Sequence, residues 1–214
     1  MSSQENTALN ILEERTSIKE YDTSVSISKE ELTKLLSVTT KAPSAWNLQH
    51  WHFTVFHSQE SKDKLLPIAF NQKQVSQASA VVAVLGDLQA NLNGEAVYGP
   101  LTEAGYMTED IKNTLLGQIN GAYQNSGFAR DAAFTNASLA AMQLMIAAKA
   151  MGYDTCAMGG FDKQAFVKEF NIDERYVPVM LISIGKPVKP AHKSNRFDVS
   201  DVCLLYTSPS PRNA

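Results

Sequence analysis

The chain has 214 residues, of which 44% are hydrophobic and 19% are charged, so it is long enough for one domain with a substantial core. Its formal net charge is −3 and its Lys and Arg residues are scattered, which excludes the clustered basic surface that nucleic-acid binding requires. The first residues carry no signal-peptide pattern, and the longest apolar stretch, residues 137–148, is shorter than the roughly 20 residues of a membrane span.

The predicted elements of the N-terminal half follow from apolar spacing and capping residues. Ser28 and Glu31 form a capping box that opens an amphipathic helix. Aromatic and β-branched residues indicate a first strand, and an unbroken apolar run that ends at Gly86 indicates a strand buried on both faces. In chain order we expect a helix over 7–15, a helix over 28–39, a strand over 51–56, a short helix over 58–66 and a strand over 80–85.

The C-terminal half is predicted to be mostly helical. Residues 88–107 show no clear period, whereas Thr108 is a candidate N-cap for an amphipathic helix. The next pattern, residues 128–151, is apolar nearly all round, which predicts burial in a large core or against another subunit. We expect helices over 108–123 and 128–151, a stop at Gly152, a helix from Asp162 through Phe170, and a buried strand over 177–184.

These elements predict a single domain over residues 1–202. No Gly-x-Gly-x-x-Gly occurs, which disfavours a dinucleotide-binding Rossmann unit. Only Cys156 and Cys203 are present, which indicates neither a disulfide framework nor a zinc site and favours a cytoplasmic location. Residues 203–214 are rich in Ser and Pro, and we interpret them as a non-native or disordered tail.

Two short blocks could hold a phosphorylated cofactor. Residues 15–19 place two cations and two hydroxyls side by side, and such groups suit a phosphate. Residues 43–49 form a polar loop whose amide side chains both donate and accept hydrogen bonds. Together they suit a cofactor such as FMN, although a basic helix end with a Ser is also an ordinary surface feature.

The run Arg15-Thr16-Ser17-Ile18-Lys19-Glu20-Tyr21-Asp22 resembles the N-terminal flavin-phosphate motif of the nitroreductase family. Four later segments resemble the same family in the same order over residues 8–202: 42–51, 71–75, 158–162 and, more weakly, 193–196. The resemblance implies an α+β, nitroreductase-like fold with a central, mostly antiparallel or mixed sheet flanked by helices. It also implies an intertwined homodimer with two FMN sites at the subunit interface.

The resemblance also implies the site residues. Those assigned to FMN are Arg15, Thr16, Ser17, Lys19, Pro43, Ser44, Asn47, Asn71, Gln74, Met158, Gly159, Gly160, Lys193 and Arg196. Those assigned to the substrate are Trp46 and Phe70. The first four and the last two serve the phosphate and ribityl chain, and the Gly-Gly turn faces flavin N5. No acid–base catalyst and no metal ligand is assigned.

Each assignment has an ordinary structural alternative. The cations can be solvated surface residues, Trp46 can be a hydrophobic anchor, and residues 71–74 can be a polar turn. Some relatives have Lys where this chain has Gln74, so a cation near the flavin ring is missing here. A flavin without that cation is expected to have a lower redox potential.

The predicted activity is that of an NAD(P)H-dependent oxidoreductase. By resemblance, NADH or NADPH donates a hydride to FMN and leaves, and a nitroaromatic, a quinone or a related small molecule then takes two electrons in a ping-pong reaction. Three alternatives stay open: another acceptor, as in dehalogenation or enone reduction; a flavin storage or regulatory protein with little turnover; and a flavin-free interaction module. The expected partners are a second copy of the chain and the acceptor, with no nucleic acid and no membrane.

Overall fold

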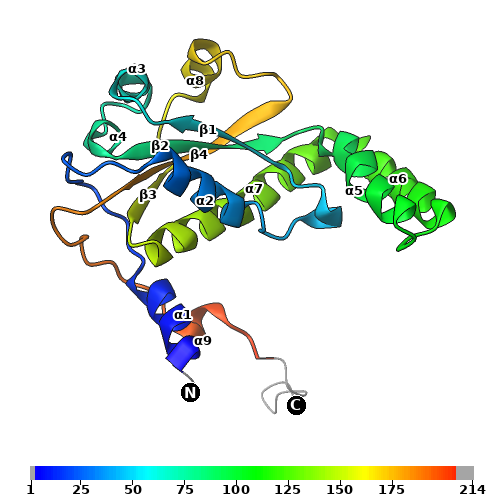
Figure 1. The fold of residues 1–214 in the computed structure, drawn as a ribbon, viewed down its shortest axis with the longest axis horizontal. Helices are drawn as coiled ribbons and strands as arrows, with labels where there is room; N and C mark the ends of the chain where they lie inside the picture. Colours follow the sequence, from blue (N-terminus) through cyan, green and yellow to red (C-terminus); the bar gives the residue numbers. More distant parts are fainter. Residues whose placement is uncertain (1–2, 206–214) are drawn as a thin grey trace, which may run out of the picture.

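A four-stranded antiparallel sheet forms the centre of the computed structural model, which describes residues 3–205 (Figure 1). Its strands, in the spatial order β1-β2-β4-β3, are β1 (Trp51–Phe56), β2 (Ala80–Asp87), β4 (Tyr176–Gly185) and β3 (Asp154–Met158). The two central strands pair with Val82 opposite Ile182. The sequence left open whether the sheet is antiparallel or mixed, and each pairing of these strands is antiparallel.

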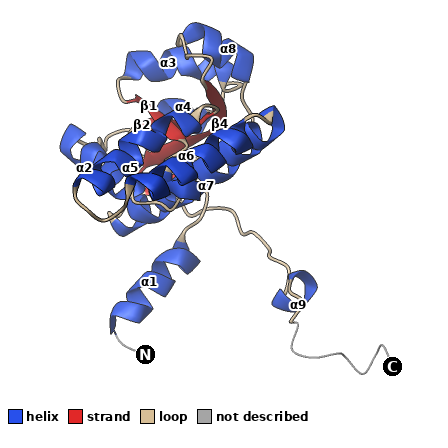
Figure 2. Ribbon diagram, turned by 90° about the vertical axis from the view of Figure 1, so that its right-hand side faces the viewer, coloured by secondary structure: helices blue, strands red, loops and turns tan. Residues whose placement is uncertain are grey.

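Helices cover both faces of this sheet, as the α+β prediction requires (Figures 1 and 2). On one face lie α2 (Lys29–Thr39) and α7 (Ser126–Ala150), and on the other α3 (Gln59–Ile68), α4 (Lys73–Gln77) and α8 (Lys163–Glu169). Alternate residues of β2 separate into the two cores, because successive side chains of a strand point to opposite faces. Val81 packs with Phe166 in one core, whereas Val82 packs with Leu144 in the other.

The long helix α7 lies close to the sheet because its buried side is made of alanines. A Cβ added to Gly86 would stand 2.9 Å from the carbonyl oxygen of Ala133, so small residues are needed on both sides of this contact. The prediction that this helix is deeply buried is confirmed for the face toward the sheet. Its other side exposes Leu139 and Met142.

A second helical unit extends from the end of the sheet (Figure 1). It consists of the short helix η2 (Ala90–Asn93), α5 (Gly94–Glu103) and α6 (Glu109–Tyr123). The sequence predicted α6 but no helix between residues 88 and 107, and α5 corrects that expectation. Two glycines and an internal Pro100 hide the apolar period there, and burial of Tyr98 against the rest of the unit stabilises the helix in spite of them.

Both ends of the described chain lie apart from the sheet (Figure 2). Helix α1 (Ser3–Glu14) and the single turn α9 (Val199–Val202) expose apolar side chains, among them Leu12 and Val202. The predicted tail lies mostly outside the described residues, and only 203–205 of it are described; its non-native origin stays a prediction. Within residues 3–205 no helix combines the length and the apolar character that crossing a membrane requires.

Candidate functional site

The basic motif that follows α1 runs beside the edge strand β3. Ser17 forms a parallel bridge with Thr155, and the amide of Ile18 donates to the carbonyl of Thr155 at 3.0 Å. This extended course points Arg15 and Thr16 toward a hollow of about 870 Å³. Ser17 and Lys19 are exposed and do not line that hollow, so the motif divides between two environments.

Residues from the C-terminal motif, 193–196, line the same hollow. Lys193 and Arg196 line it together with Arg15 and Thr16. The Arg196 guanidinium donates to Ser194 Oγ at 3.0 Å and to the Asn195 carbonyl at 2.7 Å, which leaves further N–H groups for a ligand. Lys149 also lines the hollow but pairs with Asp154 at 3.0 Å, which leaves Arg15, Lys193 and Arg196 as a donor set suited to a phosphate dianion.

A second cluster of predicted residues lies farther along β3. The buried Gln74 donates through Nε2 to Met158 Sδ at 3.3 Å and to Gln72 Oε1 at 3.1 Å. Gln72 in turn donates to the carbonyl of Gly160 at 2.7 Å. The polar turn expected at residues 71–74 is therefore the start of α4. Gln72, to which the sequence analysis assigned no role, connects α4 to the Gly-Gly turn.

The Gly159-Gly160 turn has open space beside its main chain. A Cβ added at either residue would meet no heavy atom within 4 Å, so a flat group can approach this backbone closely. Phe70 and Asn71 precede α4 in left-handed conformations, with φ of 55° and 56°, and both are exposed. The turn and these two residues lie next to the Gln72 and Gln74 side chains. Within the described residues, no hydrogen bond joins the turn to Phe70 or Asn71.

Strand β3 connects the phosphate hollow to the Gln74 cluster. Asp154 lines the hollow, and Met158 at the other end of the strand contacts Gln74. At about 3.3 Å per residue, the two ends lie roughly 13 Å apart, a separation that an elongated cofactor can span. Lys19 lies between them, with its Nζ 3.4 Å from Sγ of the buried Cys156.

The loop with the remaining predicted residues, 43–47, lies elsewhere. The amide of Ala45 donates to Asn136 Oδ1 on α7 at 2.8 Å, and Trp46 packs edge-on against Phe128. The phosphate hollow, in contrast, contains Lys149 near the other end of α7. Since a helix rises about 1.5 Å per residue, Asn136 and Lys149 lie roughly 20 Å apart. One chain therefore does not bring Pro43, Ser44, Trp46 and Asn47 to the phosphate hollow.

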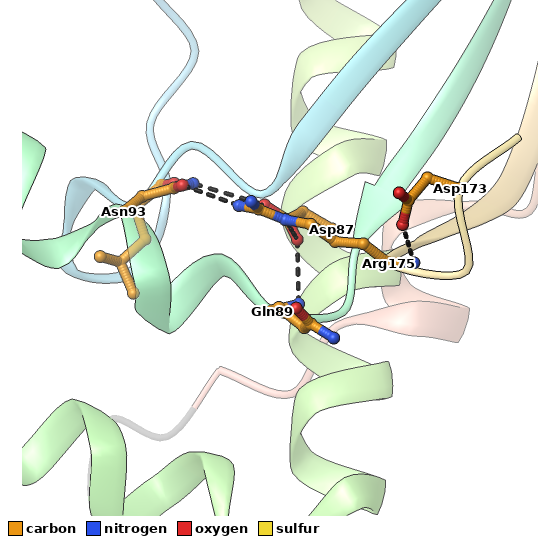
Figure 3. Close-up of polar contacts among 6 residues, drawn as sticks. Asp87, Gln89, Asn93, Asp173 and Arg175 are labelled. Atoms are coloured by element: carbon orange, nitrogen blue, oxygen red, sulfur yellow. Dashed lines mark hydrogen bonds and ion pairs between the residues drawn. The ribbon is translucent and has the colours of Figure 1, made fainter.

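A network of polar side chains around the buried Asp87 is hydrogen-bonded to this loop (Figure 3). Arg175 donates to both carboxylate oxygens of Asp87, at 2.8 and 2.6 Å, and to Asn93 Oδ1 at 2.8 Å. Asn93 donates to the carbonyl of Leu48 at 2.8 Å. The hydrogen bonds to Asp87 raise the pKa of Arg175, so the guanidinium stays charged. The only sequence signal for this network was a carboxylate at the end of an apolar strand.

His50 lies beside this network, and among the residues that the structure describes neither of its ring nitrogens has a hydrogen-bond partner. Its side chain is fully buried and stacks on Tyr123. Burial lowers the pKa of His50 to about 4, although the nearby Asp87 carboxylate acts in the opposite direction. Burial likewise raises the pKa of Tyr123 to about 12. Both side chains are therefore neutral at pH 7.

Comparison with known proteins places this geometry in a family. The model described as "Nitroreductase family" matches residues 12–186. A protein of Bacillus subtilis (strain 168) named "Putative NAD(P)H nitroreductase YodC" is 72% identical over 194 residues, which cover 91% of this chain and 96% of that protein. The "CLA biosynthesis enone reductase" of Lactiplantibacillus plantarum is 35% identical over 90% of this chain and 91% of its own length.

Solved structures have the same fold. A protein from Exiguobacterium sibiricum 255-15, described as a "putative nitroreductase in complex with FMN", is 41% identical. It superposes with a TM-score of 0.86 over 92% of this chain and 96% of that chain. A Bacillus subtilis protein described as "putative nitroreductase ydfN" superposes with a TM-score of 0.90 at 33% identity, over 94% of this chain and 99% of its own.

Proposed function

The chain belongs to the nitroreductase family, and from that premise we propose that it is an FMN-dependent oxidoreductase that takes electrons from NADH or NADPH. The observation that carries the proposal is the hollow in which Arg15 and Thr16 meet Lys193 and Arg196 from the opposite end of the chain. Nothing in the packing of a single domain requires these cations to converge. A phosphate-bearing ligand would form hydrogen bonds with all of these cations at once.

The residues present fit FMN along its whole length. Arg15, Lys193 and Arg196 would hold the phosphate, and β3 leads from there to Gln74, whose neighbours are the Gly159-Gly160 turn and Met158. The free space beside that turn accommodates a planar ring. Of the residues assigned to FMN, Ser17, Lys19 and Asn71 are exposed and do not line the hollow, and their contacts with FMN stay predictions. The exposed Phe70 was assigned to the substrate, and that contact also stays a prediction.

Bound FMN supplies the two-electron chemistry, and the protein supplies binding and orientation. Arg15, Lys193 and Arg196 would neutralise the phosphate charge and set the position of the cofactor along β3. Gln74, buried and tied to its neighbours, presents a neutral amide where a Lys would place a charge. We assign no acid–base catalyst, and we propose that donor and acceptor use the site in turn, as in a ping-pong scheme.

We further propose that the working unit is a homodimer. The loop that carries Pro43, Ser44, Trp46 and Asn47 lies roughly 20 Å from the phosphate hollow along α7, and we propose that this loop of a second copy completes the site. Apolar side chains exposed on α1, α7 and the C-terminal segment, such as Leu12, Met142 and Phe197, favour such an assembly. Sedimentation at micromolar concentration tests it, and a monomer that binds FMN with full affinity would contradict it.

Nitroaromatics and quinones are the acceptors that we propose first, because the most similar relatives named above are described as nitroreductases. Enone reduction is a second candidate, favoured by the relative described as an enone reductase, which matches nearly the whole chain. Both use the same flavin site. The cytoplasmic location expected from the cysteines stays a prediction.

The visible spectrum of the purified protein tests the proposal. We expect a flavin spectrum that bleaches promptly when NADH or NADPH is added without oxygen, and release of FMN on denaturation. Bound flavin that does not bleach would support a storage or regulatory role instead. If folded protein takes up no added FMN, the cofactor assignments are wrong.

A further inference from the structure

We propose that Tyr98 and Asn93 are positioning residues that hold loop 43–49 in one conformation and so determine which acceptors bind. The inference rests on the proposed function, because the loop is a candidate wall of the flavin and acceptor site. Its physical basis is independent of that function. It lies in how the second helical unit (η2, α5 and α6) is connected to the loop.

The loop has an unfavourable backbone conformation. Trp46, Asn47 and Gln49 have φ of 51°, 54° and 54°, in the left-handed region that favours glycine. Asn tolerates this region, but Trp and Gln do so rarely. Such conformations persist only where the surroundings impose them, and they concentrate at functional sites. The loop therefore needs external anchors.

The second helical unit supplies two of these anchors. The hydroxyl of Tyr98 on α5 donates to the Trp46 carbonyl at 2.7 Å, and Asn93 Nδ2 donates to the Leu48 carbonyl at 2.8 Å. These carbonyls flank Asn47, so the two hydrogen bonds hold both sides of the left-handed segment. Tyr98 is 7% exposed and Leu48 is fully buried, so water competes little for these contacts.

Asn93 is itself held rigidly. Its Oδ1 accepts from Arg175 Nη2 at 2.8 Å, and Arg175 is bound by Asp87 at the end of β2 (Figure 3). A continuous chain of hydrogen bonds thus runs from the sheet through Arg175 and Asn93 to the loop. Tyr98 adds a separate contact, 52 residues along the chain from Trp46.

The packing links loop 43–49 to α5. Trp46 and Leu48 pack in the same apolar cluster as Tyr98 and Ile119, so the loop is part of the core of the second helical unit. A hollow of about 370 Å³ lies between them, lined by Asn47, Leu48, Gln49, Asn93, Ala96 and Val97. A shift of α5 therefore moves the Trp46 indole and the Asn47 amide, without touching the phosphate hollow.

The test uses the flavin-loaded full chain and two isosteric variants. Tyr98→Phe removes only the hydroxyl. Asn93→Asp removes the donor to Leu48, and with it the longer contact of 3.4 Å to Asp87 Oδ2, and it keeps an acceptor for Arg175 while adding a negative charge beside Asp87. Tyr153→Phe is the matched control, because Tyr153 is 5% exposed and its hydroxyl hydrogen-bonds Glu31 at 2.9 Å, away from the loop. The readouts are KM and kcat for 1,4-benzoquinone and for the bulkier menadione, FMN affinity, and hydrogen exchange at residues 44–50.

We expect both variants to raise KM by about three- to tenfold, unequally for the two quinones, with kcat and FMN affinity nearly unchanged. Exchange at 44–50 should speed up by a similar factor, and Tyr153→Phe should change neither. The proposal is overturned if Tyr98→Phe matches Tyr153→Phe in quinone preference and loop exchange. A wild-type protein that binds FMN and yet reduces neither quinone overturns the selection role. A wild-type protein that binds no FMN overturns the proposed function, and the exchange data then still decide whether Tyr98 and Asn93 order the loop.

Discussion

Arg175 and Asp87 form a two-point ion pair that joins the ends of the two central strands. The carboxylate stands at the last residue of β2, and the guanidinium precedes the first residue of β4. The Asp87 side chain is only 3% exposed, whereas the Arg175 side chain is 26% exposed. Removal of Arg175 is costly because it leaves the buried Asp87 carboxylate without its cation.

Arg175→Met should therefore lower the free energy of unfolding by about 3 kcal/mol. Urea denaturation at pH 7 measures the change. Lys64→Met is the control, because it breaks an ion pair with Glu60 that is exposed on both sides, and it should cost less than about 0.5 kcal/mol. Equal losses in the two variants would show that burial of the Asp87 pair has no energetic consequence.

His50 should make the stability of the protein depend on pH in mildly acidic solution. The unfolded chain binds a proton at this residue below about pH 6.5, whereas the folded protein does so only near its pKa of about 4. Acidification from pH 7.5 to 5 therefore favours the unfolded state by about 2 kcal/mol. The variant His50→Leu should lose that part of the pH dependence in urea denaturation, and an unchanged slope would contradict the burial of a neutral His50.

The phosphate hollow predicts how FMN affinity responds to charge. Arg15→Ala and Arg196→Ala should each weaken FMN binding about ten- to a hundredfold, the value of a hydrogen bond to a charged group. Arg130→Ala is the control, since Arg130 lies over the ring of Phe134 and does not line the hollow. Fluorescence titration of FMN measures the affinities. An equal effect of all three substitutions would argue for general charge attraction instead of a site.

Gln74 predicts a redox effect. Gln74→Lys should raise the midpoint potential of bound FMN by tens of millivolts, because a nearby cation favours the more negative, reduced flavin and about 1.4 kcal/mol corresponds to 30 mV. Gln77→Lys, in the same short helix but lining a separate hollow, should leave the potential unchanged. Spectroelectrochemical titration distinguishes the two. A lower potential in Gln74→Lys would place the flavin ring elsewhere.

Local sequence signals predicted most elements well. The strand Trp51–Phe56 has the expected bounds, and the capping box of Ser28 and Glu31 opens α2 as expected, with both of its hydrogen bonds present. These features depend on a few neighbouring residues, and such signals are visible in a single sequence. Helix α5 was missed because its stability comes from contacts with α6 and with Leu48, which no local pattern reveals.

The candidate site was predicted in part. The resemblance identified Arg15, Lys193 and Arg196, and the structure places them around one hollow. It could not show that Pro43 to Asn47 lie far from that hollow, because the order of motifs along a sequence does not give their distances in the fold. Asn93 and Arg175 were passed over, since their significance lies in partners distant in sequence.

The closure of the phosphate hollow by Arg15 and Arg196 has a consequence for biosynthesis. One wall emerges from the ribosome almost at once, whereas the other emerges only when nearly the whole chain has been made. Domains generally form from the N-terminus as synthesis proceeds, but this hollow cannot. A nascent chain arrested before residue 193 therefore lacks Lys193 and Arg196, and the phosphate site that we propose cannot be complete until translation has passed that point.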